Sequence, residues 1–337
     1  MSKVRILFMG TPEFAREALE AMLADNHFEV VGVVTQPDRP AGRKMLLTPS
    51  PVKKFALERG LRVFSPETVN TEEFRNEVTA LSAESAVVVA FGQLLGDKFL
   101  ALFPKKAVNV HGSLLPKWRG AAPIQRSLMA GDRETGVALQ IMVKKLDAGP
   151  VLGVRKVTLS DEMTATELYP LLAKLGSELL ATEYMDYLRG NLTPIEQDEA
   201  LVTIAPKIQK SEAAVDWTRS AREILNLVRG LSLGPVPHAR RASGVSFKLH
   251  RVVVVSEGDE NARGVAGAVP GTVLRVTDAG VGQAGGQESE PGIDVQCGQG
   301  VLRLLELQPE SRARMSLQDY LRGYPVEVGE VLGGGQA

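Results

Sequence analysis

The sequence has little of several features that would mark a specialised class of protein. It contains a single cysteine, Cys297, so neither an internal disulfide nor a multi-cysteine metal site can form. It has no run of about 18 apolar residues, which excludes a membrane-spanning helix. The first ten residues, MSKVRILFMG, lack the long apolar core and small-residue cleavage site of a signal peptide. These absences predict a cytoplasmic protein with no membrane partner.

Net charge is also nearly absent, because 39 basic residues oppose 40 acidic ones. Taken alone, this balance argues against a nucleic-acid-binding protein. The basic residues nevertheless gather in three islands. Residues 37–54 hold five basic residues against one acidic (net +4), residues 105–126 hold five against none (net +5), and residues 207–251 hold nine against three (net +6). Two interpretations stay open: the islands form one charged face, or they scatter over the surface.

Apolar runs and amphipathic stretches alternate through the first half of the chain. Strands are expected at residues 4–9, 28–35, 61–64, 85–90, 107–111, 136–142 and 150–157, and helices at 13–24, 52–59, 71–82, 122–130 and 164–189. Residues 36–51 contain four prolines and are expected to be a long loop. This alternation predicts an α/β domain with a mostly parallel sheet and helices on both faces. Ligands of such sheets bind beyond the carboxyl ends of the strands.

The character of the sequence changes after residue 190. Residues 191–206 are expected to be a linker between a first domain, residues 1–190, and a second, residues 207–337. A helix is expected at 221–228, followed by short β-rich runs at 245–255, 272–276, 292–297 and 301–307. Turn-forming residues separate these runs, so the second domain is predicted to be a small β-barrel or sandwich.

The segment NVHGSLLP, residues 109–116, is the most informative for chemistry. Asn109 and His111 are two apart on an expected strand, so their side chains point to the same face, about 6.5 Å apart along it. An amide donor beside an imidazole suits stabilisation of a developing oxyanion together with proton transfer near neutral pH. The alternative interpretation is a strand end with a hydrogen-bonded structural histidine.

Two further turns are weaker signals. Asp147, in LDAGP, could orient His111 and stabilise its charged form, although an Asp before Ala-Gly-Pro is also a common turn residue. The turn Gly10–Phe14 places backbone N–H groups at a helix start, which suits an anion. Because Pro12 stands where a second glycine is needed, nicotinamide-dinucleotide binding is disfavoured. No Walker, zinc or Gly-x-Ser-x-Gly pattern is present.

Taken together, these motifs resemble the formyltransferase family that uses 10-formyltetrahydrofolate. NVHGSLLPKWRGAAPIQ (109–125) and TGVALQIMVKKLDAGPVL (135–152) carry the Asn, His, SLLP and Asp pattern of that family. MGTPEFA (9–15), the region 35–53, KIQKSEAAVDWTRSA (207–221) and LQPESRARMSLQDYLRG (307–323) are similar to the members that formylate methionyl-tRNA. The resemblance spans nearly the whole chain.

The resemblance implies a Rossmann-like catalytic domain and a C-terminal OB-like β-barrel that helps to hold tRNA. The implied reaction transfers a formyl group from 10-formyltetrahydrofolate to the α-amino group of methionyl initiator tRNA, for initiation of translation. Direct attack by the amine would need no protein nucleophile. Asn109 would then donate to the formyl oxygen, His111 would be the charged or proton-donating partner, and Asp147 would hold His111 and relay protons.

The resemblance also implies the ligand contacts. Four residues, Ser113, Leu114, Leu115 and Pro116, would line the folate site, and Phe91, Leu94 and Leu95 are further candidates for the pterin pocket. The basic loop would reach the acceptor end of the tRNA through Arg39, Arg43 and Lys44. No metal is expected, and the protein is expected to be a monomer.

Departures from the family pattern and an alternative function remain. Leu233 and Gly234 replace a Pro–Trp pair of the family, and the family's Gly-Lys-Lys run in the basic loop is shortened to Arg43-Lys44. A sugar-nucleotide N-formyltransferase would keep the same catalytic and folate residues but would not need the basic islands. A non-catalytic RNA-binding protein and an oxidoreductase fit the motifs less well.

Overall fold

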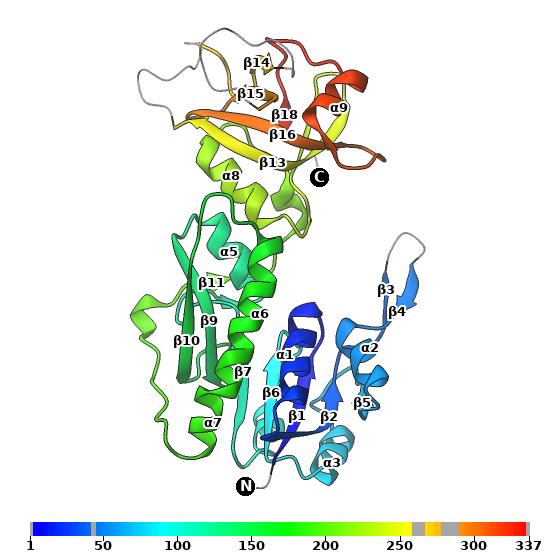
Figure 1. The fold of residues 1–337 in the computed structure, drawn as a ribbon, viewed down its shortest axis with the longest axis vertical. Helices are drawn as coiled ribbons and strands as arrows, with labels where there is room; N and C mark the ends of the chain where they lie inside the picture. Colours follow the sequence, from blue (N-terminus) through cyan, green and yellow to red (C-terminus); the bar gives the residue numbers. More distant parts are fainter. Residues whose placement is uncertain (1–2, 42–44, 258–266, 278–289, 335–337) are drawn as a thin grey trace. The chain divides into compact units, whose positions relative to one another are not determined.

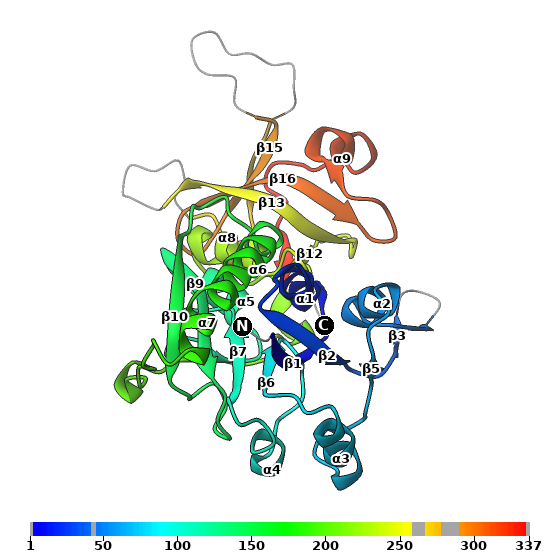
Figure 2. The same ribbon diagram turned by 60° about the horizontal axis from the view of Figure 1, so that its bottom comes forward.

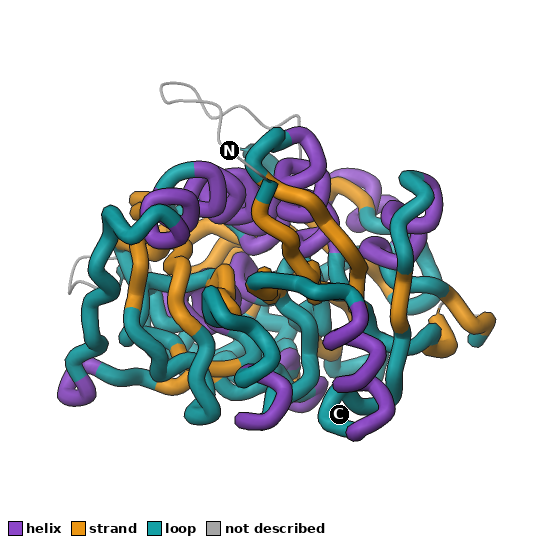
Figure 3. Tube along the Cα trace, turned by 90° about the horizontal axis from the view of Figure 1, so that it is seen from below, coloured by secondary structure: helices purple, strands orange, loops and turns teal. Residues whose placement is uncertain are grey.

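The structure is a computed structural model, and it describes residues 3–41, 45–257, 267–277 and 290–334. The chain forms two compact units (Figure 1), and Figure 3 distinguishes the helices, strands and loops of the same chain by colour. The first unit comprises residues 1–123, 134–159 and 167–206, and the second comprises residues 124–133, 160–166 and 207–337. Among the described helices, none has the length and apolar character needed to cross a membrane.

The first unit is built on a seven-stranded sheet in the order β10-β9-β7-β6-β1-β2-β5. Five neighbouring strands are parallel: β7 (Ala107–His111), β6 (Ser85–Val89), β1 (Val4–Gly10), β2 (Phe28–Val34) and β5 (Val63–Phe64). β9 (Glu134–Ile141) runs antiparallel to β7, and β10 (Val151–Thr158) runs antiparallel to β9. The expected mostly parallel α/β sheet is therefore confirmed, with an antiparallel pair at one edge.

Helices cover both faces of this sheet, because alternate side chains of its central strands are apolar and buried. Leu7 and Met9 of β1 pack in one core with the side chains of α3 (Glu72–Ala80) and α4 (Asp97–Leu100). On the opposite face lie α1 (Glu13–Ala24), α6 (Ala165–Ala181) and α7 (Glu183–Leu188), as Figures 1 and 2 show. Tyr184 of α7 is fully buried and donates a hydrogen bond to Ser85 of β6 (2.6 Å). Burial raises the pKa of its hydroxyl, so it remains a donor.

Strand β7 carries the candidate catalytic residues, and its position is fixed tightly from the α6 face. A Cβ atom on Gly176 of α6 would lie 2.6 Å from a methyl group of Val110, so the helix approaches β7 as closely as glycine allows. Because side chains alternate along a strand, Asn109 and His111 point away from α6. The contact therefore fixes the distance between α6 and β7. The opposite face of β7 carries the candidate catalytic side chains.

Two expected elements differ in the structure. The region expected to be a loop, residues 36–51, contains a short hairpin of β3 (Arg39–Ala41) and β4 (Leu46–Thr48), and α2 (Pro51–Glu58) begins directly after it. The proline-containing strand β3 pairs with β4, although the composition of this region is that of a loop. The long helix expected at 164–189 is two helices, α6 and α7, because Thr182 between them has non-helical backbone angles (φ −113°, ψ −83°).

The segment expected to be a linker, residues 191–206, packs along the first unit. Ile195 exchanges backbone hydrogen bonds with Val151 of β10 (2.8 and 2.9 Å). β11 (Ile204–Ala205) pairs in parallel with β8 (Arg119–Gly120), just after the SLLP turn. This segment is therefore held at two points, like an additional pair of edge strands.

The second unit is an antiparallel β structure, as expected. Its strand order is β14-β15-β16-β13-β12-β18, with β17 (Met315–Ser316) paired to β16. The strands are β12 (His238–Arg240), β13 (Ser246–Ser256), β14 (Val273–Thr277), β15 (Gly292–Gln296), β16 (Val301–Pro309) and β18 (Gly333–Gly334). A bridge between Thr272 and Val331, with Val273 donating to the carbonyl of Glu330 (2.8 Å), joins the two ends of the sheet. This closure makes the sheet an OB-like barrel.

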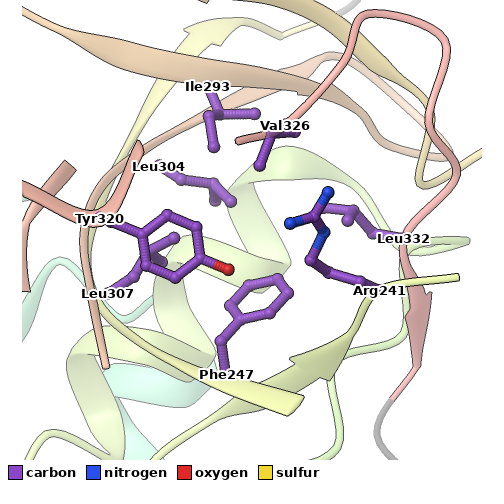
Figure 4. Close-up of a pocket in the computed structure, with 8 residues that line it drawn as sticks. All are labelled: Arg241, Phe247, Ile293, Leu304, Leu307, Tyr320, Val326 and Leu332. Carbon is purple, nitrogen blue, oxygen red and sulfur yellow. The ribbon is translucent and has the colours of Figure 1, made fainter. Parts of the chain in front are cut away.

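The interior of the barrel is filled by side chains rather than by a ligand-sized cavity. Helix α8 (Ala221–Gly230) packs Ile224 and Val228 into its core, and α9 (Leu317–Gly323) adds Leu317 and Tyr320. A cavity of about 10 Å³ remains, with the Tyr320 hydroxyl and the Arg241 guanidinium facing it (Figure 4). That is about the space of one water molecule.

Closure of the barrel also involves an ion pair, and this leads to a stability prediction. Arg241 donates two hydrogen bonds to the Glu330 carboxylate (2.7 and 2.6 Å), and both side chains are about 85% buried. Glu330→Ala would leave a buried guanidinium unpaired, and we expect it to lower the free energy of unfolding by about 3 kcal/mol. Denaturation followed by the fluorescence of Trp217, in the same core, measures this. Glu327→Ala, which removes an exposed carboxylate nearby, should change it by less than about 0.5 kcal/mol; equal effects would contradict the assignment.

Candidate active site

The structure brings the three expected catalytic side chains into one buried corner at the carboxyl end of β7. Asn109 is 9% exposed and His111 is 5% exposed. Asp147 follows β9, and its carboxylate lies against both: Oδ1 accepts a hydrogen bond from Asn109 Nδ2 (3.4 Å), and Oδ2 lies 3.7 Å from His111 Nδ1. The spacing of the two strand residues therefore predicts their common face, which the structure confirms.

The imidazole of His111 is oriented by the chain that follows it. Its Nε2 lies 2.8 Å from the carbonyl oxygen of Trp118. Because a carbonyl oxygen only accepts hydrogen bonds, Nε2 carries a hydrogen, and Nδ1 is the nitrogen whose protonation can change. The 3.7 Å separation from Asp147 is longer than a hydrogen bond. Asp147 therefore acts on His111 as a neighbouring charge, rather than through the direct hydrogen bond that the expected orienting role implies.

Other donors fix the Asp147 carboxylate. The backbone N–H of Gly120 donates to Oδ2 (2.9 Å), and the side-chain amide of Gln140 donates to Oδ1 (3.1 Å). Gln140 lies directly opposite Asn109 in the pairing of β9 with β7, so both amides share one face of the sheet. The carboxylate thus accepts hydrogen bonds from three groups of the protein: the side chains of Asn109 and Gln140 and the backbone N–H of Gly120.

A second layer of polar residues holds the loop that carries Asp147. Gln197, in the segment 191–206, donates to the backbone carbonyls of Asp147 (2.8 Å) and Gly149 (2.7 Å). Arg119, only 2% exposed, donates two hydrogen bonds to Gln197 Oε1 (3.0 and 2.9 Å) and one to Glu199 (2.9 Å). Hydrogen bonds from Lys145 and Arg119 lower the pKa of Glu199 to about 2.

Sequence reasoning missed these supporting residues. Gln140 could have been recognised from the sequence as a candidate, because it is a polar residue next to the apolar residues of a strand. Gln197 could not have been recognised in this way, because it lies in a polar stretch whose composition is that of a linker. Arg119 was assigned to a basic island, but its burial removes it from the surface.

Of the two interpretations left open for the basic islands, a single charged face does not hold for several island members. Arg229 is 4% exposed, and Arg126 and Arg241 are mostly buried in ion pairs with Glu212 and Glu330. These guanidinium groups serve the packing of the second unit. Within the described residues, Arg39 is an exposed island member, and it lies 2.9 Å from Glu67. Arg43 and Lys44 lie outside the described residues.

The expected folate residues form the turn after β7. Ser113 is fully buried; its hydroxyl donates to the carbonyl of Lys117 (2.7 Å) and its N–H to the carbonyl of His111 (2.9 Å). Ser113 therefore shapes the turn. Leu115 is 9% exposed, whereas Leu114 and Pro116 are partly exposed.

The other pterin-pocket candidates differ in exposure. Phe91 and Leu95 are buried in the core beneath β6, whereas Leu94 is 71% exposed. No cluster of three or more His, Cys, Asp or Glu side chains suited to a metal ion occurs in the described part of the chain.

Comparisons with known proteins show the family to which the chain belongs. A family model described as formyl transferase matches residues 2–183, and one described as the formyl transferase C-terminal domain matches residues 207–325. The methionyl-tRNA formyltransferase of Bdellovibrio bacteriovorus is 51% identical, covering 99% of this chain and 100% of its own. That of Methylococcus capsulatus is 41% identical, covering 98% and 100%.

Among solved structures, a sugar 3N-formyl transferase crystallised with dTDP and 5-N-formyl-THF has the same fold. Its TM-score is 0.62 at 16% identity, and the match covers 93% of this chain and 100% of that one. The two family models define the chain as a formyl transferase with both of that family's domains. The full-length relatives narrow this further: the chain belongs to the methionyl-tRNA formyltransferase family.

The geometry of the Asp147 loop gives a prediction for Gly149. A Cβ atom at this position would overlap the backbone carbonyl of Ile141. Gly149→Ala should therefore push the loop away from β9 and lower the free energy of unfolding by about 1–3 kcal/mol in denaturant titrations. Gly323→Ala is the matched control, because a Cβ there meets no atom within 4 Å. A Gly149→Ala variant as stable as this control would show that the loop is not closely packed.

Proposed function

We propose that this chain transfers the formyl group of 10-formyltetrahydrofolate to the α-amino group of methionyl initiator tRNA, releasing tetrahydrofolate and formyl-methionyl-tRNA. Membership in the methionyl-tRNA formyltransferase family over the full length of the chain supports the substrates. The observation that carries the chemistry is the convergence of Asn109, His111 and Asp147 at the buried end of β7. An amide, an imidazole and a carboxylate suit acyl transfer to an amine without a protein nucleophile.

The division of labour between the two parts of the chain belongs to the same proposal. Residues 1–190 would be the catalytic domain and residues 207–337 the OB-like tRNA-binding domain. The separate matches of the two family models, on either side of residues 184–206, support this division. Residues 191–206 would connect the domains and, through Gln197, also support the site. The protein would act in the cytoplasm as a monomer.

Asn109 would stabilise the developing negative charge. Its amide nitrogen carries two hydrogens, and the contact with Asp147 uses one of them. The second would donate to the formyl oxygen as the amine attacks the formyl carbon. Because Asn109 is 9% exposed and its amide contacts Asp147, this donor would not need to reorganise during the reaction.

His111 and Asp147 would manage the proton that the attacking amine must lose. With Nε2 committed to Trp118, the changing proton would reside on Nδ1, which faces Asp147. The carboxylate lies 3.7 Å away, and one water molecule could carry a proton between the two groups. Asp147 would therefore contribute charge and position.

The turn after β7 would hold the folate. Leu114 and Pro116 are partly exposed and present apolar surface in this turn, Leu115 is buried, and Ser113 fixes the shape of the turn from within. Apolar lining with a few polar groups is typical of sites for planar ligands. Phe91 and Leu95 would support the pterin end from the core, whereas the exposed Leu94 would not.

The basic region around the β3–β4 hairpin would contact the acceptor end of the tRNA through Arg39, Arg43 and Lys44. Proteins read RNA most readily at unpaired or weakly paired ends, because the deep groove of a duplex hides its bases. In the described part of this region, the exposed side chain of Arg39 suits this kind of contact. Three exposed apolar residues, Met45, Leu46 and Leu47, lie in the same region.

The oxyanion role of Asn109 predicts a large kinetic defect. Removing one such donor typically costs about 100- to 1000-fold in rate, and we expect that loss for Asn109→Ala in single-turnover formyl transfer. Asn191→Ala, which truncates an exposed amide, is the control and should leave the rate unchanged. A loss of less than about tenfold for Asn109→Ala would contradict the assignment.

The basic hairpin predicts a defect that is specific for tRNA. Arg43→Ala should raise the KM for methionyl-tRNA several-fold more than the KM for folate, because it removes a phosphate-binding charge. Lys98→Ala removes a charge outside the basic islands and should change neither constant. Equal effects of Arg43→Ala on both substrates would count against this role.

The function itself is tested by formyl transfer from 10-formyltetrahydrofolate to initiator methionyl-tRNA at a fixed, stated ionic strength. Elongator methionyl-tRNA and an amino-sugar nucleotide serve as competing acceptors. Selective transfer to the initiator tRNA is expected. Transfer to the sugar with none to tRNA would retain the catalytic residues but refute the proposed substrate and the role of the basic hairpin.

A further inference from the structure

The side chain of Gln197 joins a buried cation to the loop that carries Asp147. Its Oε1 accepts two hydrogen bonds from Arg119 (3.0 and 2.9 Å), and its Nε2 donates to the carbonyls of Asp147 and Gly149. The guanidinium offers only donors and the carbonyls offer only acceptors, so the orientation of the amide is determined. A glutamine satisfies both sides, whereas a glutamate could not donate to the carbonyls.

The contact of Gln197 is made with a turn whose backbone conformation is uncommon. Asp147 has a positive φ of 47°, in the left-handed region that residues other than glycine adopt uncommonly, although aspartate does so more readily than most. Gln197 binds the carbonyl of this residue and that of Gly149, two residues later (2.8 and 2.7 Å). The amide therefore holds both ends of the turn that aims the Asp147 side chain at the site.

The same amide also reaches the carboxylate by a second route. Gln197 Nε2 lies 3.3 Å from Gln140 Oε1, and Gln140 Nε2 donates to Asp147 Oδ1 (3.1 Å). Hydrogen bonds in such a chain polarise one another. A chain of hydrogen bonds therefore joins the Arg119 guanidinium to the Asp147 carboxylate, through the side-chain amide of Gln197 and then that of Gln140.

We propose that Gln197 is a positioning residue for formyl transfer: it fixes the Asp147 turn and carboxylate without contacting substrate. The inference rests on the proposed function for its kinetic readout. A misplacement of about 1 Å can cost about 100-fold in rate. Gln197→Ala should therefore lower kcat by about 10- to 100-fold, with less than threefold change in the KM for methionyl-tRNA. Glu196→Ala, which truncates the exposed neighbouring side chain, should leave kcat unchanged.

A double-mutant cycle separates positioning from loss of stability. If Gln197 acts through Asp147, then adding Gln197→Ala to Asp147→Asn should change the single-turnover rate by less than about threefold, because the carboxylate it positions has been replaced. A general loss of folded protein would instead multiply the two effects. Multiplicative effects would overturn the proposal.

The Gln197→Glu variant tests the donor specifically. It keeps an acceptor for Arg119 but faces the two loop carbonyls with no hydrogen to donate, so its kcat should fall at least as far as that of Gln197→Ala. Wild-type kcat in Gln197→Glu would refute the donor role. Absence of formyl transfer by the unmodified protein would refute the proposed function instead, so the two failures are distinguishable.

Discussion

The carboxylate of Asp147 is the point at which the separate pieces of the first unit meet. It is acceptor-only when charged, and it receives hydrogens from Asn109 on β7, Gln140 on β9 and the Gly120 N–H on β8. These donors come from three different strands. The positions of the strands are therefore coupled to one another through a single charged group.

A buried charge of this kind is costly unless it is surrounded by partners, and the structure supplies them in layers. The inner layer is the set of amides around the carboxylate. The outer layer is Arg119, which neutralises the region from beneath and is itself paired with Glu199 near the surface. Hydrogen bonds from Lys145 and Arg119 lower the pKa of Glu199 to about 2, which strengthens the preference of this carboxyl group for its charged form. The charges are thus fixed before substrate binds, as electrostatic catalysis requires.

Local patterns predicted much of this arrangement. Alternation of apolar runs and amphipathic stretches was sufficient for the parallel sheet, and the two-residue spacing of Asn109 and His111 placed both on one face. The hairpin in residues 36–51 could not be predicted, because strand pairing there competes with a proline-rich composition. Arg119 could not be assigned to the interior either, because burial of a guanidinium depends on acceptors such as Gln197, 78 residues away in sequence.

The segment 191–206 shows why domain boundaries drawn from sequence similarity differ from those drawn from contacts. The match to the catalytic family model ends at residue 183, and the composition of the following residues is that of a connector. Yet this segment pairs with β10 and β8 and supplies the amide that binds the Asp147 turn. A catalytic group can be well placed only if every element that constrains it is present. The compact packing of the first unit therefore extends to Pro206, beyond the last residue that the catalytic family model matches.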